Sequence, residues 1–125
     1  MTHVLLVEPD VVLARAYSRA LEHYGHSVAH HTSGQTALMA IDTRRPEVIV
    51  LELQLLVHNG LEFLYELRSY ADWQSIPVIM LGDVPKDELG KGLDTAYLQP
   101  FRYIRKTGTS LQELCRIIDE QTVAI

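Results

Sequence analysis

Short apolar runs without polar alternation are the first pattern along this chain. The clearest is VIVL at residues 48–51, which is rich in β-branched residues and breaks at the acidic Glu52. Such a run is typical of a central parallel strand that is buried on both faces of a sheet. Similar runs predict further strands at 2–7, 27–31, 77–81 and 103–105.

Residues with helical spacing follow each predicted strand. Asp10 is a favourable N-cap for the first helix, which should end at Gly25. Ser110 and Glu113 form a capping box at the start of the last helix. The core-facing residues of these two helices are expected to be Leu13, Ala14, Tyr17, Leu21 and Tyr24 in the first, and Leu111, Leu114, Cys115 and Ile118 in the last.

The fourth helix, expected over 86–96, is the weakest of the series. It contains Gly90 and Gly92, each of which disfavours helix by roughly 1 kcal/mol relative to alanine. Five strand–helix units in series predict one α/β domain over residues 1–125. Its doubly wound, five-stranded parallel sheet should carry helices on both faces, joined by right-handed crossovers.

Composition and charge exclude several classes of function. The net charge of −5 and the lack of a basic stripe on any predicted helix argue against direct binding of nucleic acid. The apolar runs are too short to span a membrane, and the N-terminus leads directly into a strand pattern. The sequence therefore predicts a cytosolic protein without a membrane segment.

The lone cysteine and the histidines give weaker signals. Cys115 has no internal disulfide partner and should be a buried thiol rather than a nucleophile. The four histidines near the first helix and second strand meet no fixed ligand spacing, so no transition-metal site is predicted there. They are His23, His26, His30 and His31.

Charged and small residues stand where four of the strands end. The first strand is followed by Glu8-Pro9-Asp10, the third ends at Glu52, the fourth at Gly82 and the fifth at Lys106. Ligands of open parallel sheets bind at the carboxyl ends of the strands, so these residues should share one functional crevice. The alternative is that Glu52 is only an acid that reaches solvent as its strand ends.

Four segments in order resemble the receiver domain of two-component response regulators across nearly the whole chain. They are VLLVEPD, PEVIVLELQLLVHNGLEFL, PVIMLGD and YIRKTGTSLQEL. The resemblance implies the flavodoxin-like (βα)5 receiver fold, with strand order 2-1-3-4-5. It also implies a site in which two acids and a phosphoacceptor aspartate hold Mg²⁺, while a lysine and a serine or threonine hydroxyl contact the phosphoryl oxygens.

The acids of this chain depart from that pattern. Glu8 matches the first acid, but Pro9 stands at the second and supplies no side-chain oxygen. Glu52 replaces the phosphoacceptor aspartate, and Asp10 is better used as an N-cap. Glu8, Asp10 and Glu52 form a poor oxygen set for Mg²⁺, so binding is expected to be weak or absent and no cofactor is predicted.

The switch positions are only partly retained. Gly82 stands at the hydroxyl position, whereas Lys106 matches the lysine and Tyr103 the aromatic residue that usually reports the switched state. Glu52 has one more methylene than aspartate, which places its carboxylate closer to Lys106. We therefore predict a Glu52–Lys106 pair, which either imitates the phosphorylated state or merely fills a dead pocket.

These departures predict a degenerate receiver that is not an enzyme and signals through protein contacts without phosphorylation. One alternative is a working phosphoacceptor at Glu52 or a nearby acid such as Asp83. A flavodoxin-like cofactor binder is disfavoured because the acidic EPD loop cannot cradle a phosphate. The expected interaction surface, for a protein partner or a homodimer, is the face of the fourth helix, fifth strand and fifth helix, with Tyr97, Leu98, Phe101 and Tyr103. The alternative, favoured for Leu98 and Phe101, is that these side chains cover the core beneath an irregular helix.

Overall fold

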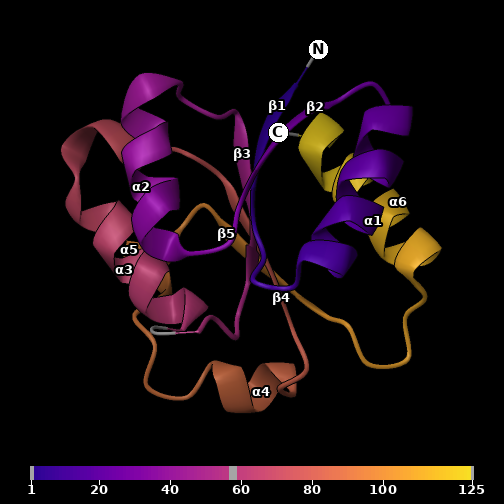
Figure 1. Cartoon of the computed structure of the whole chain (residues 1–125). Helices are drawn as coiled ribbons and strands as arrows, with labels where there is room; N and C mark the ends of the chain where they lie inside the picture. The colour runs from indigo at the N-terminus through magenta and orange to yellow at the C-terminus, as the bar shows by residue number, and fades with distance from the viewer. Residues whose placement is uncertain (1, 57–58, 125) are drawn as a thin grey trace.

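Five parallel strands form a single sheet in the order β2-β1-β3-β4-β5 in the computed structural model, which describes residues 2–56 and 59–124 (Figure 1). The fold class and strand order expected from the sequence are confirmed. The strands are β1 (His3–Val7), β2 (Ser27–His31), β3 (Val48–Glu52), β4 (Val78–Gly82) and β5 (Phe101–Arg105).

Helices cover both faces of this sheet, as Figure 1 shows. On one face lie α1 (Val11–His23) and α6 (Leu111–Ala124), and on the other α2 (Gly34–Thr43), α3 (Gly60–Ser69) and the short α5 (Thr95–Leu98). A short α4 (Lys86–Leu89) lies near the carboxyl ends of the strands, and a single 3₁₀ turn, η1 (Ala71–Trp73), follows α3. No helix in the described ranges is long and apolar enough to cross a membrane.

Alternation along the strands divides the core into two layers. In β1, Leu5 and Val7 face the layer under α2 and α3, whereas Val4 and Leu6 face the layer under α1 and α6. Every residue of β1, β3 and β4 is buried, as expected for strands covered on both sides. This burial explains the unbroken apolar runs at residues 4–7, 48–51 and 78–81.

Two helix starts agree with their predicted caps. The Asp10 carboxylate accepts hydrogen bonds from the backbone N–H groups of Val12 and Leu13, at 3.0 and 3.1 Å. The Ser110 hydroxyl accepts from the Glu113 N–H at 3.1 Å, but the Glu113 carboxylate binds Arg116 instead of returning to the cap. The capping box at α6 is therefore only half formed.

Three expectations about the helices are wrong. The single helix over 86–96 is divided into α4 and α5, because the chain turns at Gly92 with a φ of 75° that only glycine adopts without strain. Tyr24 and Leu111 are exposed rather than in the core. Tyr24 follows α1, three residues after the buried Leu21, and Leu111 begins α6, three residues before the buried Leu114, so both lie beyond the part of the helix that packs on the sheet.

Candidate functional site

The carboxylate of Glu52 is enclosed at the end of β3 by two donors from its own chain. One oxygen, Oε1, accepts a hydrogen bond from the Lys106 ammonium, and the other, Oε2, accepts from the backbone N–H of Gln54 at 2.9 Å. Lys106 is placed by the end of β5, where its own N–H donates to the Gly82 carbonyl at 2.8 Å. The predicted Glu52–Lys106 contact is therefore present.

A second buried carboxylate, Glu8, lies beside this pair at the end of β1. Burial raises the pKa of Glu8 to about 7, and the charge of Glu52 adds to the shift while Lys106 opposes it. Burial also disfavours the charge on Lys106, but its hydrogen bond to Glu52 and the surrounding carboxylates outweigh that effect and raise its pKa. Lys106 is thus a firmly held cation between two acids.

The groups that would have to hold Mg²⁺ do not converge on one point. Pro9 offers no side-chain oxygen, the Asp10 carboxylate caps α1, and both oxygens of Glu52 already accept hydrogen bonds. Within residues 2–56 and 59–124, no three His, Cys, Asp or Glu side chains are grouped so that they could hold a metal ion. This donor set fits Mg²⁺ poorly, because the cation requires several oxygens in octahedral geometry.

The space above Gly82 is filled by Tyr103. A β-carbon on Gly82 would lie 2.7 Å from the Tyr103 hydroxyl and 2.9 Å from Leu53 Cδ2, closer than real side chains approach. The buried Tyr103 donates its hydroxyl to the Val84 carbonyl at 2.7 Å, which holds the ring in place. A serine or threonine at residue 82 is thus incompatible with this position of Tyr103.

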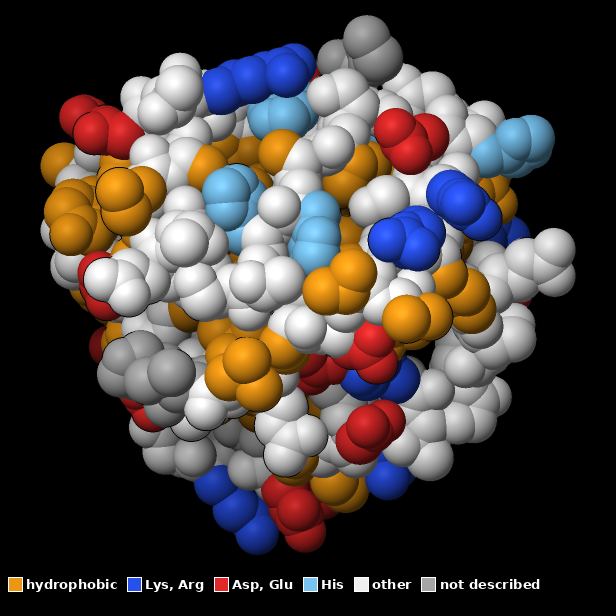
Figure 2. All heavy atoms as spheres, viewed as in Figure 1, with side chains coloured by type: hydrophobic (Ala, Val, Ile, Leu, Met, Phe, Trp, Pro, Cys, Tyr) orange, Lys and Arg blue, Asp and Glu red, His pale blue; other side chains and the backbone are white. Residues whose placement is uncertain are grey.

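These residues stand at or just after the ends of β1, β3, β4 and β5, the edge of the sheet that faces downward in Figure 1, and acidic and basic side chains are mixed over the lower half of the face in Figure 2. The family model described as "Response regulator receiver domain" matches residues 4–119. This chain is a receiver domain. It is the receiver domain of a two-component response regulator, and its resemblance to that family is confirmed.

Known regulators are similar to it over most of its length. The KDP operon transcriptional regulatory protein KdpE of Escherichia coli is 34% identical over 81% of this chain and 46% of its own length. The transcriptional regulatory protein QseB of Haemophilus influenzae is 32% identical over 90% of this chain and 52% of its own length. The receiver domain thus spans about half the length of these relatives.

Solved receiver structures share its fold. The chemotaxis response regulator CheY4 of Vibrio cholerae superposes with a TM-score of 0.83 at 20% identity, covering 98% of both chains. The phosphorylated cyanobacterial phytochrome response regulator RcpA superposes with a TM-score of 0.75 at 25% identity, covering 96% of this chain and 90% of its own.

The predicted interaction residues of the receiver domain do not form one exposed surface. Leu98 is fully buried and Tyr103 is nearly so, and Phe101 is half-buried. Only Tyr97 is exposed, and its ring stacks on Tyr65 with centroids 5.9 Å apart. The expectation that Leu98 and Tyr103 take part in an interaction surface is therefore wrong, because both are needed in the core under α5 and β5.

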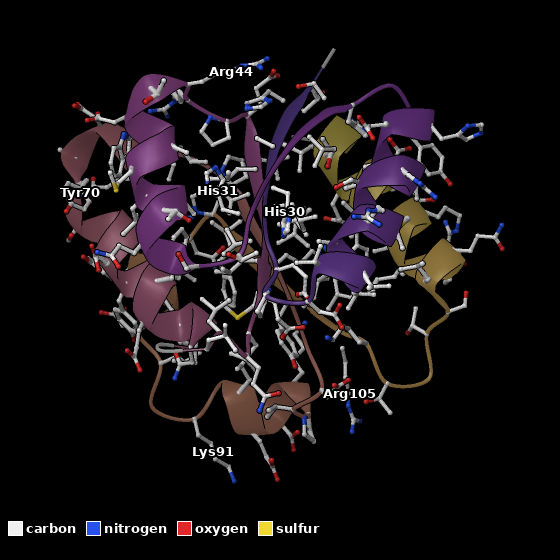
Figure 3. All side chains as sticks on the ribbon, viewed as in Figure 1. His30, His31, Arg44, Tyr70, Lys91 and Arg105 are labelled. Atoms are coloured by element: carbon white, nitrogen blue, oxygen red, sulfur yellow. The ribbon has the colours of Figure 1, made fainter. Side chains whose placement is uncertain are left out.

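The histidines also have separate environments. His26 bonds Asp119 of α6 at 2.7 Å, His30 the Glu8 carbonyl at 2.8 Å, and His31 the Thr36 hydroxyl at 3.2 Å. Figure 3 shows His30 and His31 on the two sides of β2, as successive strand residues must be. Cys115 is buried as predicted, and burial raises the pKa of its thiol to about 11.

Sequence reasoning missed Arg68, an arginine of α3 that is fully buried. Its guanidinium donates to three backbone carbonyls: Leu98 at 2.9 Å, Pro100 at 2.7 Å and Trp73 at 3.2 Å. Burial lowers the pKa of Arg68, although a guanidinium stays charged in proteins. Arg68 lies four residues after the buried Leu64, which was the only sign in the sequence that it faces inward.

The raised pKa of Glu8 predicts a pH dependence of stability. A carboxyl whose folded pKa of about 7 exceeds its ordinary 4.5 contributes stability that is complete below pH 4.5 and is lost as the pH rises through 7. The free energy of unfolding of Glu8→Gln, measured relative to that of the wild type, should therefore rise by on the order of 2 kcal/mol as the pH increases from 5 to 8. Urea unfolding at both pH values measures this, and an unchanged difference between the two proteins contradicts it.

Proposed function

We propose that this receiver domain signals through protein contacts without being phosphorylated, and that it is not an enzyme. The observation that carries the proposal is the Glu52–Lys106 ion pair, in which a carboxylate of the chain already binds the lysine that would otherwise contact a phosphoryl group. In this proposal the state of β5 is set by the sequence itself. A cytosolic location remains part of the prediction.

The reactivity of Glu52 supports this proposal. A nucleophile must present a free oxygen in line with the phosphoryl donor, and misplacement by even 1 Å can cost about 100-fold in rate. Both oxygens of Glu52 are engaged, by Lys106 and by the backbone of Gln54. The side chain is thus held as a hydrogen-bond acceptor rather than presented for attack.

The region around Gly82 supports it independently. Where the family uses a hydroxyl, this chain has no side chain, and the Tyr103 hydroxyl occupies the adjoining space. The hydroxyl of Tyr103 is anchored by its hydrogen bond to the Val84 carbonyl, and its ring is buried. The aromatic residue that usually reports the switched state is therefore held in a single position by packing.

Incubation with acetyl phosphate, or with a phosphorylated histidine kinase, and Mg²⁺ should leave the mass of the domain unchanged. Intact-mass spectrometry measures this, with a conventional receiver as the positive control for labelling. A stable gain of one phosphoryl group that disappears in Glu52→Gln would establish the alternative, a working phosphoacceptor. The variant Asp83→Asn tests the exposed neighbouring acid in the same way.

Mg²⁺ should bind with a dissociation constant above about 1 mM, because Glu8 and a paired Glu52 offer few free oxygens. Isothermal titration calorimetry measures this affinity. Lys106→Met serves as the matched control, since it releases Glu52 and should tighten Mg²⁺ binding. Sub-millimolar affinity in the wild type would contradict the prediction.

The flavodoxin-like alternative has a separate test. A yellow colour of the purified protein would reveal a bound flavin.

For the partner we propose the face formed by α4, β5 and α6, which a second copy of the chain or another protein would contact. Tyr97 is the one residue of the predicted set that is exposed among the described side chains, but it lies on α5, where its ring stacks on Tyr65 of α3, and it belongs to none of α4, β5 and α6. Direct contact with nucleic acid is not part of the proposal, since the net charge is −5.

A further inference from the structure

A long groove lies between α2 and α3, away from the Glu52–Lys106 pair. Its volume is about 820 Å³, and its walls come from α2, α3 and the segments that follow β3 and α3. In Figure 2 hydrophobic side chains gather at the left edge of the view, beside α2. Figure 3 places Tyr70, at the end of α3, on the same side of the molecule.

Large apolar side chains are exposed along this groove. Met39 is 70% exposed, Leu56 82% and Tyr70 46%, and all three line it. Single exposed apolar residues need no explanation, but several around one concave surface indicate a binding site. The floor is the buried Phe63, which packs so closely on α2 that a β-carbon at Gly34 would lie 2.9 Å from its ring.

One end of the groove is held rigid. Tyr70 and Trp73 both line it, and their rings contact each other with centroids 4.6 Å apart. The buried Arg68 binds the Trp73 carbonyl, and Arg45 binds the Asp72 carbonyl and, at 3.0 Å, the Ser75 hydroxyl. An aromatic wall that is already ordered loses little entropy when a partner binds.

In the part of the chain that the structure describes, the charged side chains that line the groove are all acidic: Asp42, Glu62 and Glu66. Asp42 of α2 and Glu66 of α3 line it from opposite walls, and neither forms an ion pair with a described residue. Among the described residues that line the groove there is no lysine or arginine. An occupant with apolar side chains between basic ones would complement both features.

We propose that this groove binds an α-helix of a partner protein whose apolar stripe is flanked by lysine or arginine. Two helices of ten residues form its walls, so their length of about 15 Å accommodates roughly three turns of a bound helix. The apolar stripe packs on Phe63, Met39 and Tyr70, while the basic residues face Asp42 and Glu66. This inference does not depend on the proposed function, because neither Glu52 nor Lys106 lines the groove.

Trp73 provides a direct probe, because it is the only tryptophan in the sequence and it lines the groove. The titrant is a synthetic helical peptide of about 14 residues with leucine at i, i+4, i+7 and i+11 and lysine on both flanks. A matched peptide carries the same leucines with glutamate on the flanks. The lysine peptide should shift the Trp73 emission saturably and bind at least tenfold more tightly than the glutamate peptide. This difference in affinity should become smaller at 0.5 M salt, which screens the charges.

Variants locate the binding. Met39→Lys should weaken the lysine peptide at least tenfold, and Asp42→Asn with Glu66→Gln should remove most of the preference over the glutamate peptide. Val12→Lys is the matched control, since it puts the same charge on a 77% exposed apolar position of α1, outside the groove. It should bind like the wild type.

Three results would overturn the proposal. The first is that Trp73 emission shows no saturable change up to about 1 mM peptide. Any binding would then be far weaker than that of a specific helix-in-groove complex. The second is equal affinity for the lysine and glutamate peptides. The third is a dimer in sedimentation velocity that Met39→Lys dissociates and Val12→Lys does not, which would make a second copy of the chain the occupant.

Discussion

Glu52→Gln should lower the free energy of unfolding by about 2 to 3 kcal/mol. Loss of one partner from a fully buried ion pair costs about 3 to 5 kcal/mol, and from an exposed pair at most about 1 kcal/mol. The Glu52 side chain is 8% exposed and that of Lys106 21%, so this pair lies closer to the buried case. Most of the loss arises because Lys106 remains charged beside a neutral amide.

The double variant Glu52→Gln with Lys106→Met should recover at least 1 kcal/mol of that loss, since no buried charge is then left alone. Denaturant unfolding of the four proteins in this cycle gives the coupling energy. The control is Glu113→Gln, which breaks a surface ion pair with Arg116 in which both side chains are nearly half exposed. It should leave stability almost unchanged, because water screens an exposed ion pair.

The same cycle distinguishes the two interpretations of Glu52. If the pair sets the position of β5, NMR shifts of the Tyr97 and Tyr103 rings should change together with stability, and self-association should change in parallel. Strictly additive free energies with unchanged ring shifts in all three variants would show that Glu52 only fills a vacated pocket.

The parallel sheet and the convergence of its strand ends could be predicted because both depend on local patterns. Continuous apolar runs identify strands covered on two faces, and Glu52 and Lys106 stand where two such runs end. Since parallel strands share one carboxyl edge, residues 54 positions apart are brought into contact without any further information. The cap at Asp10 was equally predictable, because it requires only neighbouring residues.

The region from 86 to 103 was less predictable, because competing effects decide it. Helical spacing favoured one helix, but Gly92 turns the chain with a positive φ. Apolar and aromatic residues such as Leu98 and Tyr103 occur both in interaction surfaces and in cores. Whether Tyr103 is buried or exposed depends on whether the core has space for its ring. Here the absence of a side chain at Gly82 provides that room.

Arg68→Met should have the largest effect of any single substitution discussed, a loss of about 3 to 5 kcal/mol. The guanidinium joins α3 to the Leu98 and Pro100 carbonyls before β5 and to the Trp73 carbonyl after α3. Methionine fills much of the volume but leaves the Leu98 carbonyl without its donor, while the Pro100 and Trp73 carbonyls keep only the backbone N–H groups of Val78 and Ile76. A buried unsatisfied group costs about 1 to 3 kcal/mol, and each lost hydrogen bond from a charged donor about 1.5 to 3 kcal/mol. These partners lie outside regular strands, which is why no sequence pattern revealed them.

Arg68→Lys should recover only part of this loss, because one ammonium cannot reproduce the planar fork that reaches three carbonyls in different directions. Arg102→Met on β5 is the control, since Arg102 is exposed and should tolerate the change. Urea unfolding measures the stabilities, and Trp73 emission in the native state reports whether its segment has moved. If Arg68→Met is as stable as Arg102→Met and Trp73 emission is unchanged, the guanidinium does not hold β5 and the groove wall in place.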